Sequence, residues 1–302
     1  MNYILSFDIG GTGVKYGVVT SEGELVFQDK FATPKPSPSQ GKKLLDTMIH
    51  YADELTQKYE ISAIGISTHG VVDFNKGSVI LSSHHLPGLK DLPIKKTLKD
   101  RYGVLVTVDN DVNSAAIGEL WQGSAKQYKN FIFIALGTSI GGAVIVNRHL
   151  VRGRNFCGGE IGYLITNEKD KKPQFMPGAW ESYASASVLT KRYLKAKKNT
   201  KLRPEDFQND LANGDAQTVE LFDRFVFSLT SGIISLAHTL DPDAFILGGA
   251  IVGMDQLLFD PVIKSYQSRV LTTCANTPIM AAKLGNTAGM IGAAYTAYRR
   301  IK

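Results

Sequence analysis

The chain has little cysteine and no long apolar run. Its 302 residues include only two cysteines, Cys157 and Cys274, which are too few for a disulfide framework or a cysteine zinc site. We therefore expect a reducing, cytoplasmic location. Asp8 interrupts the first apolar run, so that run predicts a strand rather than a signal peptide. No run has the length of a membrane span, and we expect no membrane partner.

Two common nucleotide-binding motifs are also missing. The sequence has no G-x-x-x-x-G-K-[ST], which excludes a P-loop enzyme, and no G-x-G-x-x-G that opens a helix, which argues against a Rossmann site. The net charge is +6, but the basic residues are scattered. The densest segment, 191–203, fits a solvated helix face and loop. We therefore expect no nucleic-acid partner, and the modest positive field suits an anionic nucleotide.

What is present is the composition of a globular α/β protein. The chain is 43% hydrophobic and 21% charged, and it is long enough for two domains. Apolar runs of strand length alternate with segments of helical spacing, which predicts α/β architecture. We expect an N-terminal domain over residues 1–113, to which a C-terminal helix at 287–302 returns. A larger C-terminal domain is expected over 114–286.

Apolar runs joined by a glycine turn occur twice. Residues 131–136 and 143–146 flank the turn 137–142, and residues 3–7 and 14–19 flank the turn 8–13. Glycines let backbone N–H groups approach an anion, and Thr and Ser add hydroxyl donors. Either turn alone is also compatible with an ordinary tight hairpin. Two similar units indicate an internal duplication and favour a phosphate clamp between two related domains.

Acidic side chains supply the remaining chemistry. Asp109, Asn110 and Asp111 follow an apolar strand and precede a helix. An ionised aspartate near a substrate hydroxyl can act as a base in phosphoryl transfer, and the helix dipole is expected to keep it ionised. The alternative is a plain helix N-cap by Asn110 or Asp111. Glu160 and Glu181 could bind vicinal sugar hydroxyls or could be surface carboxylates.

Seven segments together resemble one known family over the whole chain. They are D-I-G-G-T at 8–12, V-D-N-D-V-N-S-A-A-I-G-E at 108–119, G-T-S-I-G-G at 137–142, R-G-R-N-F-C-G-G-E-I-G at 152–162, W-E-S-Y-A-S at 180–185, L-G-G-A at 247–250 and L-G-N-T-A-G-M-I-G-A-A at 284–294. In this order they are similar to the ROK (repressor–open reading frame–kinase) sugar kinases. The resemblance implies an actin-like, ribonuclease H-like ATPase fold with two duplicated domains and a cleft between them. It also implies a homodimer that uses ATP and Mg²⁺ to phosphorylate a hexose at the C6 hydroxyl.

The resemblance further implies roles for single residues. Asp111 matches the catalytic base. Three residues match the sugar ligands: Asn110, Glu160 and Glu181. We expect Gly70 and Tyr163 to belong to the same sugar-binding site. The ATP-binding residues are Asp8, Gly10, Gly11, Thr12, Gly13 and Lys15 in the first phosphate motif, Thr138, Gly141 and Gly142 in the second, and Gly248 and Gly249 in the adenosine segment. Asp8 is also assigned to Mg²⁺, through the nucleotide.

Two departures from the family pattern bear on the substrate. Tyr163 stands where the family usually has a histidine, and the stretch 167–179 has no cysteine where the family has a zinc cluster. We therefore expect no zinc. β-Glucoside kinases of the family share both features, so a β-glucoside such as cellobiose is the leading substrate prediction. Phe175, Met176 and Trp180 are expected to leave room for, and stack on, a second ring or an aryl group.

Several alternatives remain open at this point. Within the class they are glucokinase, fructokinase and N-acetylmannosamine kinase, and the loop at 168–178 can also have changed without changing specificity. Outside the class the alternative is a non-catalytic sugar-binding sensor, against which Asp8, Asp111 and both glycine turns argue. A repressor of the family would carry a helix-turn-helix before the first hairpin, and the early position of Asp8 argues against one here.

Overall fold

The computed structural model describes residues 2–83, 86–170 and 176–301, and the chain divides into two compact units. The first unit comprises residues 1–127, 152–158 and 283–302, and the second comprises 128–151 and 159–282. The boundary near residue 113 expected from the sequence differs from this division. Helix α3 (Asp111–Gln122) belongs to the first unit because it packs along the C-terminal helix α9 (Ala288–Tyr298).

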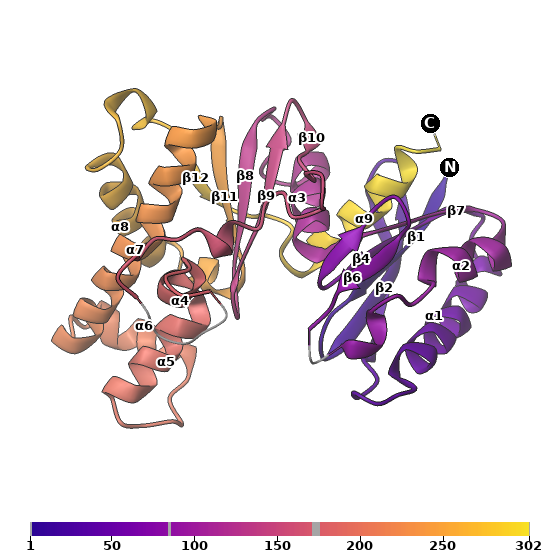
Figure 1. Cartoon of the computed structure of the whole chain (residues 1–302), viewed down its shortest axis with the longest axis horizontal. Coiled ribbons are helices and arrows are strands. Elements are labelled where there is room, and N and C mark those ends of the chain that lie inside the picture. Colours follow the sequence, from indigo (N-terminus) through magenta and orange to yellow (C-terminus); the bar gives the residue numbers. More distant parts are fainter. Residues whose placement is uncertain (1, 84–85, 171–175, 302) are drawn as a thin grey trace. The chain divides into compact units, whose positions relative to one another are not determined.

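A five-stranded mixed sheet forms the centre of the first unit (Figure 1). Its strands, in sheet order, are β3 (Leu25–Ala32), β2 (Gly13–Thr20), β1 (Tyr3–Ile9), β4 (Ile61–Thr68) and β7 (Leu105–Asn110). The first three strands are antiparallel neighbours, whereas β4 and β7 run parallel to β1. The carboxyl ends of β1, β4 and β7 therefore share one edge of the sheet.

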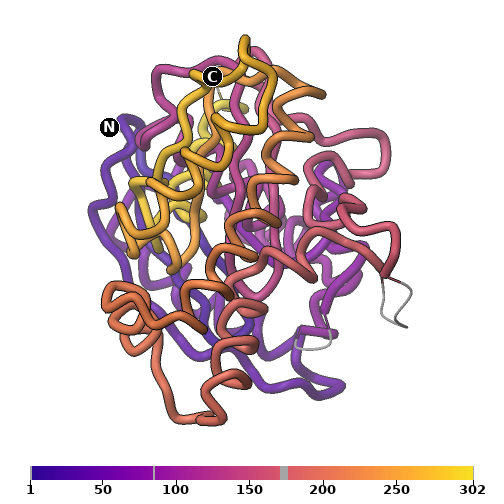
Figure 2. Tube along the Cα trace, turned by 90° about the vertical axis from the view of Figure 1, so that its left-hand side faces the viewer, coloured from indigo at the N-terminus to yellow at the C-terminus, as the bar shows by residue number. Residues whose placement is uncertain are grey.

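Side-chain alternation along β1 assigns a helix layer to each face of this sheet. Leu5, Phe7 and Ile9 pack with α1 (Gln40–Thr56) and α2 (Ile94–Tyr102), whereas Ile4 packs with α9. The C-terminal helix α9 thus lies beside the first strand, almost a whole chain away in sequence (Figure 2). A methyl group on Gly65 would lie 2.1 Å from the carbonyl oxygen of Ala293, so glycine allows α9 to approach the sheet this closely.

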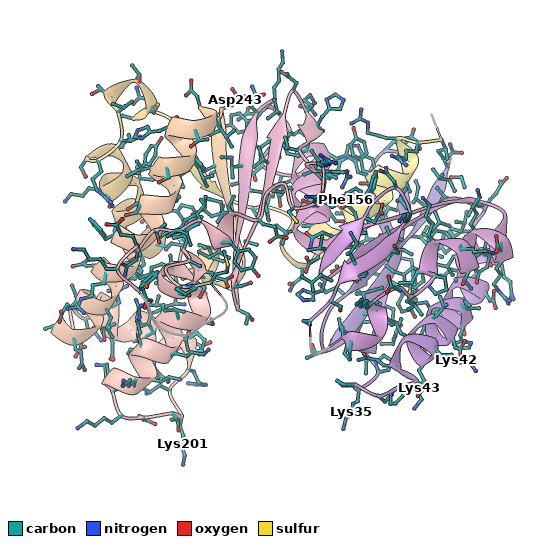
Figure 3. The ribbon with its side chains drawn as sticks, viewed as in Figure 1. Lys35, Lys42, Lys43, Phe156, Lys201 and Asp243 are labelled. Carbon is teal, nitrogen blue, oxygen red and sulfur yellow. The ribbon has the colours of Figure 1, made fainter. Side chains whose placement is uncertain are left out.

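The second unit repeats the same sheet plan. Its strands, in sheet order, are β10 (His149–Leu150), β9 (Ile140–Val146), β8 (Phe131–Leu136), β11 (Ala244–Gly248) and β12 (Ile279–Ala281). Again the first three are antiparallel neighbours and the last two run parallel to the central strand. Asp243, labelled in Figure 3, accepts the backbone N–H groups of Lys129 and Asn130 at 2.9 and 2.8 Å, so it fixes the start of β8 beside β11. The matching order and directions confirm the internal duplication.

Five helices occur among the described residues of the second unit: α4 (Glu181–Ala184), α5 (Ala186–Ala196), α6 (Pro204–Ala212), α7 (Ala216–Leu240) and α8 (Gln256–Gln267). Helices α4 and α5 are separated by Ser185, whose backbone is extended at φ −78° and ψ 152°. Helices α6 and α8 were not expected from the sequence.

A small hairpin, β5 (Val71–Asp73) and β6 (Ser78–Leu81), completes the first unit beyond β4. Gly70 joins β4 to this hairpin at φ +102°, where a side chain would also lie 2.3 Å from the carbonyl oxygen of Leu81. Within the described residues, no helix is long and apolar enough to cross a membrane.

Candidate active site

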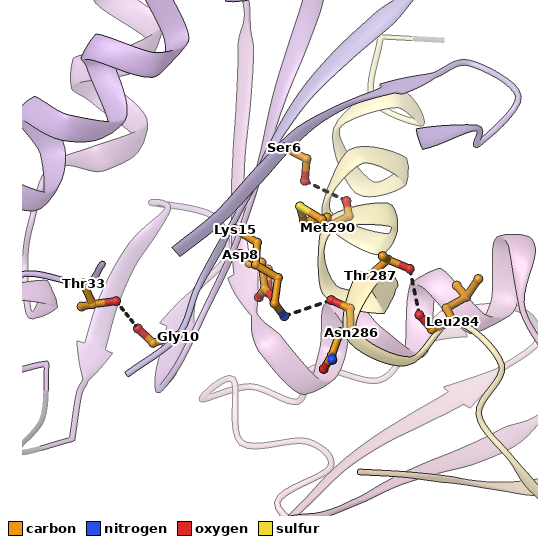
Figure 4. Close-up of polar contacts among 10 residues, drawn as sticks. Ser6, Asp8, Gly10, Lys15, Thr33, Leu284, Asn286, Thr287 and Met290 are labelled. Carbon is orange, nitrogen blue, oxygen red and sulfur yellow. Dashed lines mark hydrogen bonds and ion pairs between the residues drawn. The ribbon is translucent and has the colours of Figure 1, made fainter. Parts of the chain in front are cut away.

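The first glycine turn joins β1 to β2 and is closed by short backbone contacts. The N–H of Gly10 donates to the carbonyl oxygen of Gly13 at 3.0 Å, and the Thr33 hydroxyl donates to the carbonyl oxygen of Gly10 at 2.7 Å (Figure 4). Apart from its chain neighbours, no described residue has a heavy atom within 4 Å of the position that a Gly11 side chain would take, and Gly11 and Thr12 are exposed. The turn is thus held at its base and open at its tip, where an anion can reach the backbone.

Asp8 lies at the end of β1, on the face of the sheet that α9 covers. Its carboxylate accepts a hydrogen bond from the Ser67 hydroxyl at 2.7 Å and pairs with the Lys15 ammonium at 3.2 Å. Lys15 also donates to the carbonyl oxygen of Asn286 at 2.9 Å (Figure 4). A methyl group on Gly289 would lie 2.9 Å from an Asp8 oxygen, so α9 fits here only with glycine. These contacts fix one carboxylate and one cation beside the glycine turn.

Asn110 is the N-cap of α3. Its side-chain oxygen accepts the N–H groups of Val112 and Asn113 at 2.8 and 3.1 Å. Its amide nitrogen donates to the carbonyl oxygen of Gly70 at 3.0 Å and to the Asp111 carboxylate at 3.0 Å. The capping alternative is thus correct for Asn110, and the cap brings three predicted site residues into direct contact.

Asp111 occupies the first turn of α3 and is half-buried. The pKa of its carboxyl group is raised to about 6. Burial is the largest cause and charge repulsion by Asp8 adds to it, whereas His69 and the N–H groups of Val112 and Asp111 lower the pKa. Desolvation thus outweighs the favourable N–H groups at the start of α3. The carboxyl group remains mostly ionised near neutral pH and is a stronger base than an exposed aspartate.

The second glycine turn lies between β8 and β9, and α5 braces it. The Ser187 hydroxyl donates to the carbonyl oxygen of Thr138 at 2.6 Å, and the N–H of Ser187 donates to that of Gly137 at 3.1 Å. Gly249, at the end of β11, has φ +100°, and a side chain there would lie 2.1 Å from the carbonyl oxygen of Leu136. The Gly248–Gly249 segment therefore lies beside the strand that leads into the turn.

Gly141 and Gly142 lie within β9 rather than in the turn. A side chain on Gly142 would lie 2.3 Å from the Ile161 side chain and 2.7 Å from the carbonyl oxygen of Gly159. The absence of a side chain at Gly142 thus makes room for the segment that carries Glu160. This packing function accounts for Gly142 within the second unit.

Glu160, Tyr163 and Glu181 form one acidic group in the second unit. Burial raises the pKa of Glu181, the N–H of Ile140 lowers it, and Glu160 raises it by charge repulsion. Burial also raises the pKa of the Tyr163 hydroxyl, and both glutamates add to that increase. A methyl group on Gly162 would lie 3.2 Å from a Glu181 oxygen and 2.2 Å from the carbonyl oxygen of Ile140. The Glu-x-Gly-Tyr sequence therefore places two carboxylates and a phenol together.

The proposed stacking function of Trp180 is wrong. Its side chain is completely buried, and its indole N–H donates to the carbonyl oxygen of Ser228 at 2.8 Å. Gly232 in α7 makes the space for the ring, since a methyl group there would lie 2.1 Å from it. Met176 is 36% exposed, and Phe175 lies outside the described residues. Trp180 therefore supports the core of the second unit and is not available to a substrate.

A cavity of about 150 Å³ in the second unit was not anticipated from the sequence. Ala250, Ile251 and Met254, which directly follow Gly248–Gly249, form one wall. The opposite walls come from α5 and α6, and the lining is mostly apolar with Thr190, Arg203 and Gln208 as polar members. The apolar run after Gly249 was the available signal, but the unexpected helix α6 completes the cavity.

A second unanticipated feature is an ion pair next to Asn110. The buried Asp109 carboxylate pairs with both terminal nitrogens of the Arg152 guanidinium at 2.7 Å each. Arg152 lies in the segment 152–158, which belongs to the first unit. The chain before and after this segment, 128–151 and 159–282, belongs to the second unit. The sequence offered Asp109 as part of the acidic motif, but nothing in it indicated the partner.

The residues around Asp8 fit a nucleotide-bound Mg²⁺. That ion is commonly held by one or two carboxylates and by substrate phosphates, with several waters retained. Asp8 supplies a carboxylate whose orientation Ser67 and Lys15 fix, at the base of an open glycine turn. Over the ranges that the structure describes, no cluster of three or more His, Cys, Asp or Glu side chains is arranged to hold a metal ion.

Two α/β units with the same sheet order, each with a glycine turn after its central strand, define an actin-like ATPase fold. The model of the ROK family matches residues 4–300, and the chain therefore belongs to the ROK family. This confirms the resemblance inferred from the seven segments.

Individual relatives cover nearly the whole chain. The chain is 31% identical to a glucokinase of Streptomyces coelicolor, with 97% of each chain covered. It is 29% identical to a β-glucoside kinase of Klebsiella pneumoniae, with 97% of this chain and 95% of that protein covered. It is also 29% identical to a xylose repressor of Bacillus subtilis, with 96% of this chain and 75% of the repressor covered.

Solved structures agree with this assignment. A ROK hexokinase from Thermus thermophilus is similar with a TM-score of 0.86 at 26% identity, with 99% of both chains covered. A ROK family glucokinase from Streptomyces griseus, in complex with glucose and AMPPNP, is similar with a TM-score of 0.81 at 28% identity. There the match covers 99% of this chain and 100% of the other.

Proposed function

We propose that this protein is an ATP-dependent sugar kinase that phosphorylates the C6 hydroxyl of a hexose or a β-glucoside. The observation that carries the proposal is the Asn110–Asp111 pair at the start of α3. Asp111 accepts hydrogen bonds from Val112 N–H and from the Asn110 amide, and burial raises the pKa of its carboxyl group to about 6. A base with this pKa is ionised at neutral pH and accepts a proton readily as a hydroxyl attacks.

In this proposal Asp111 takes the proton of the sugar C6 hydroxyl, whose oxygen then forms a bond to the γ-phosphorus of ATP while the bond to the β-phosphate oxygen breaks. The transition state of phosphoryl transfer is loose, so positioning contributes more than proton removal. Asn110 orients Asp111 and Gly70 through its amide group. Glu160 and Glu181 accept hydrogen bonds from sugar hydroxyls, and Tyr163 lies beside both.

The nucleotide is assigned to the two glycine turns and the cavity. Backbone N–H groups of the turns are assigned to phosphate oxygens, and Asp8 would hold Mg²⁺, which when bound neutralises charge on the phosphates. Lys15 adds a cation next to Asp8. The cavity after Gly249 has apolar walls suited to a flat base, and Thr190, Arg203 and Gln208 supply hydrogen-bonding groups.

The preferred sugar is proposed to be a β-glucoside, on the basis of Tyr163 and the cysteine-free stretch 167–179. Tyr163 is 38% exposed, so its side chain is partly accessible, and an aromatic ring can pack against a sugar ring. Glucokinase, fructokinase and N-acetylmannosamine kinase activities are the alternatives within the same reaction class. A cytoplasmic location, a homodimeric state and independence of zinc are further predictions.

A sugar panel tests the proposal. Purified protein is incubated with Mg²⁺-ATP and glucose, fructose, N-acetylmannosamine or cellobiose, and both ADP and sugar phosphate are measured, with Asp111→Asn as the inactive control. Formation of a 6-phosphate with any of these sugars supports the kinase. Binding of a sugar without turnover would instead support a sensor. If kcat/KM for glucose exceeds that for cellobiose by tenfold, a difference of about 1.4 kcal/mol, the β-glucoside assignment is wrong.

A further inference from the structure

Asp109 lies two residues before the proposed base Asp111 and is buried beside it. Asp109 is the last residue but one of β7, and its side chain is only 3% exposed. Neighbouring Val106 and Val108 pack toward α1 and α2, so alternation directs Asp109 to the opposite face of the sheet. An ionised carboxylate in such a place is costly unless it is paired and hydrogen-bonded.

Arg152 supplies the pairing in a fixed geometry. Its two terminal nitrogens lie 2.7 Å from the two Asp109 oxygens, and its guanidinium carbon lies 3.5 Å from the centre of the Phe74 ring. Phe74 is itself only 7% exposed, and the Arg300 guanidinium lies 4.5 Å from the same ring. One of the two Arg152–Asp109 contacts is a hydrogen bond and the other an ion-pair contact. A planar guanidinium can contact both carboxylate oxygens and the ring at once, whereas a lysine cannot.

The same carboxylate also contacts the residues on either side of the proposed base. One Asp109 oxygen accepts the N–H of Asn110 at 2.8 Å and the side-chain amide of Asn113 at 3.3 Å. Asn110 and Asn113 therefore connect Asp109 to the residue before Asp111 and to the first turn of α3. In the segment 152–158, the N–H of Gly158 donates to the carbonyl oxygen of Arg152 at 2.9 Å, which closes the segment into a loop held on the first unit.

We propose that Arg152 is a positioning residue, which through its paired contact with Asp109 fixes the Asn110–Asp111 pair and compensates the charge of Asp109 beside it. Its kinetic consequence rests on the proposed kinase function, but its effect on the charge of Asp111 does not. Asp111 is also faced by His69 from the end of β4 and by Asp8 from β1, and both are unchanged by substitutions in the pair.

Two single substitutions have opposite electrostatic consequences. Arg152→Met leaves the Asp109 charge uncompensated, which favours the protonated form of Asp111 and raises its pKa. Asp109→Asn leaves the Arg152 charge uncompensated, which favours the ionised form and lowers that pKa. Both substitutions break the paired contact, so both reduce kcat/KM for the sugar by about 10-fold to 100-fold. The KM for ATP stays within about twofold, since no nucleotide contact is removed.

The surface pair Arg101–Asp53 provides a matched control. It lies in the same unit and also joins an arginine to both oxygens of an aspartate, through Nε at 2.9 Å and one terminal nitrogen at 2.6 Å, but it joins α2 to α1, and the two side chains are 49% and 36% exposed. Arg101→Met is expected to leave kcat/KM and the pKa of Asp111 unchanged. Arg152→Lys keeps the positive charge but cannot contact both carboxylate oxygens in the same way. If Arg152→Met fails to fold, this variant separates the effect of positioning from that of charge compensation.

The experiment measures kcat/KM against pH and, independently, the pKa of Asp111 by ¹³C carboxyl NMR, with Asp111→Asn to assign the signal. Opposite pKa shifts in Arg152→Met and Asp109→Asn, with no shift in Arg101→Met, support the inference. A loss of thermal stability in Arg152→Met without change in kcat/KM or in the Asp111 pKa would overturn it. If the wild-type protein phosphorylates no sugar, the proposed function fails, and the NMR shifts alone still decide this inference.

Discussion

Replacement of Asp111 by asparagine is expected to make the protein more stable and nearly inactive at the same time. The shape and the two hydrogen bonds to one side-chain oxygen are retained, since an amide oxygen can accept from Val112 N–H and from the Asn110 amide. Only the charge and the proton-accepting oxygen are lost. We expect kcat to fall by about 10²–10⁴-fold with little change in the sugar KM.

The magnitude of the stability gain follows from the pKa of this group. Burial raises the pKa of Asp111 from its ordinary value of 3.8 to about 6. Each pKa unit is equivalent to about 1.4 kcal/mol, so the ionised group costs about 3 kcal/mol in the folded protein. Because the folded-state pKa is the higher one, this cost is present in full above pH 6 and disappears as the pH falls toward 4. The asparagine variant gains stability over the same interval.

Thermal unfolding of both proteins at pH 4.5, 6 and 7.5 measures the difference. The variant should melt several degrees higher at pH 7.5, by about 2–4 °C for each kcal/mol, and the gap should close at low pH. The kinetic counterpart is an acid limb in the wild-type kcat/KM profile near pH 6. A variant that is less stable than the wild type at every pH would refute the reasoning, because the buried charge would then carry no cost.

Three further predictions concern other residues. Gly289→Ala places a methyl group 2.9 Å from an Asp8 oxygen, so we expect a higher KM for Mg²⁺-ATP and an unchanged KM for the sugar; equal effects on both would contradict a local displacement of Asp8. Glu119 is fully buried and accepts hydrogen bonds from Leu284 N–H and from the N–H and hydroxyl of Ser124 at 2.7–2.9 Å. Glu119→Ala should lower the free energy of unfolding in urea by at least about 2 kcal/mol, whereas substitution of the exposed Glu205 by alanine should cause no measurable loss. Elemental analysis after chelation should find no stoichiometric zinc and retained Mg²⁺-dependent activity; zinc whose removal unfolds the protein would contradict the interpretation of the cysteine-free stretch 167–179.

Local patterns in the sequence predicted the strands beside the two glycine turns and the duplication. Apolar runs on either side of the turns located β1, β2, β8 and β9, because a buried strand must be apolar and a tight turn needs conformational freedom. The exact ends differ, since β9 begins at Ile140 and includes two glycines of the expected turn. The same reasoning placed Asn110 and Asp111 at the junction of a strand and a helix. Helix α6 was missed because it is short and begins at Pro204, in a stretch whose polarity is typical of a loop.

The groups available for chemistry can be read from the amino-acid sequence: the carboxylates Asp8, Asp111, Glu160 and Glu181 and the two glycine turns. Their environment depends on the folded chain. It buried Trp180 in the core of the second unit, raised the pKa of Asp111 through burial, and paired Asp109 with Arg152 across 43 positions of the chain. Desolvation and ion pairing depend on atoms brought together by folding, and no local pattern records which distant segment will supply them.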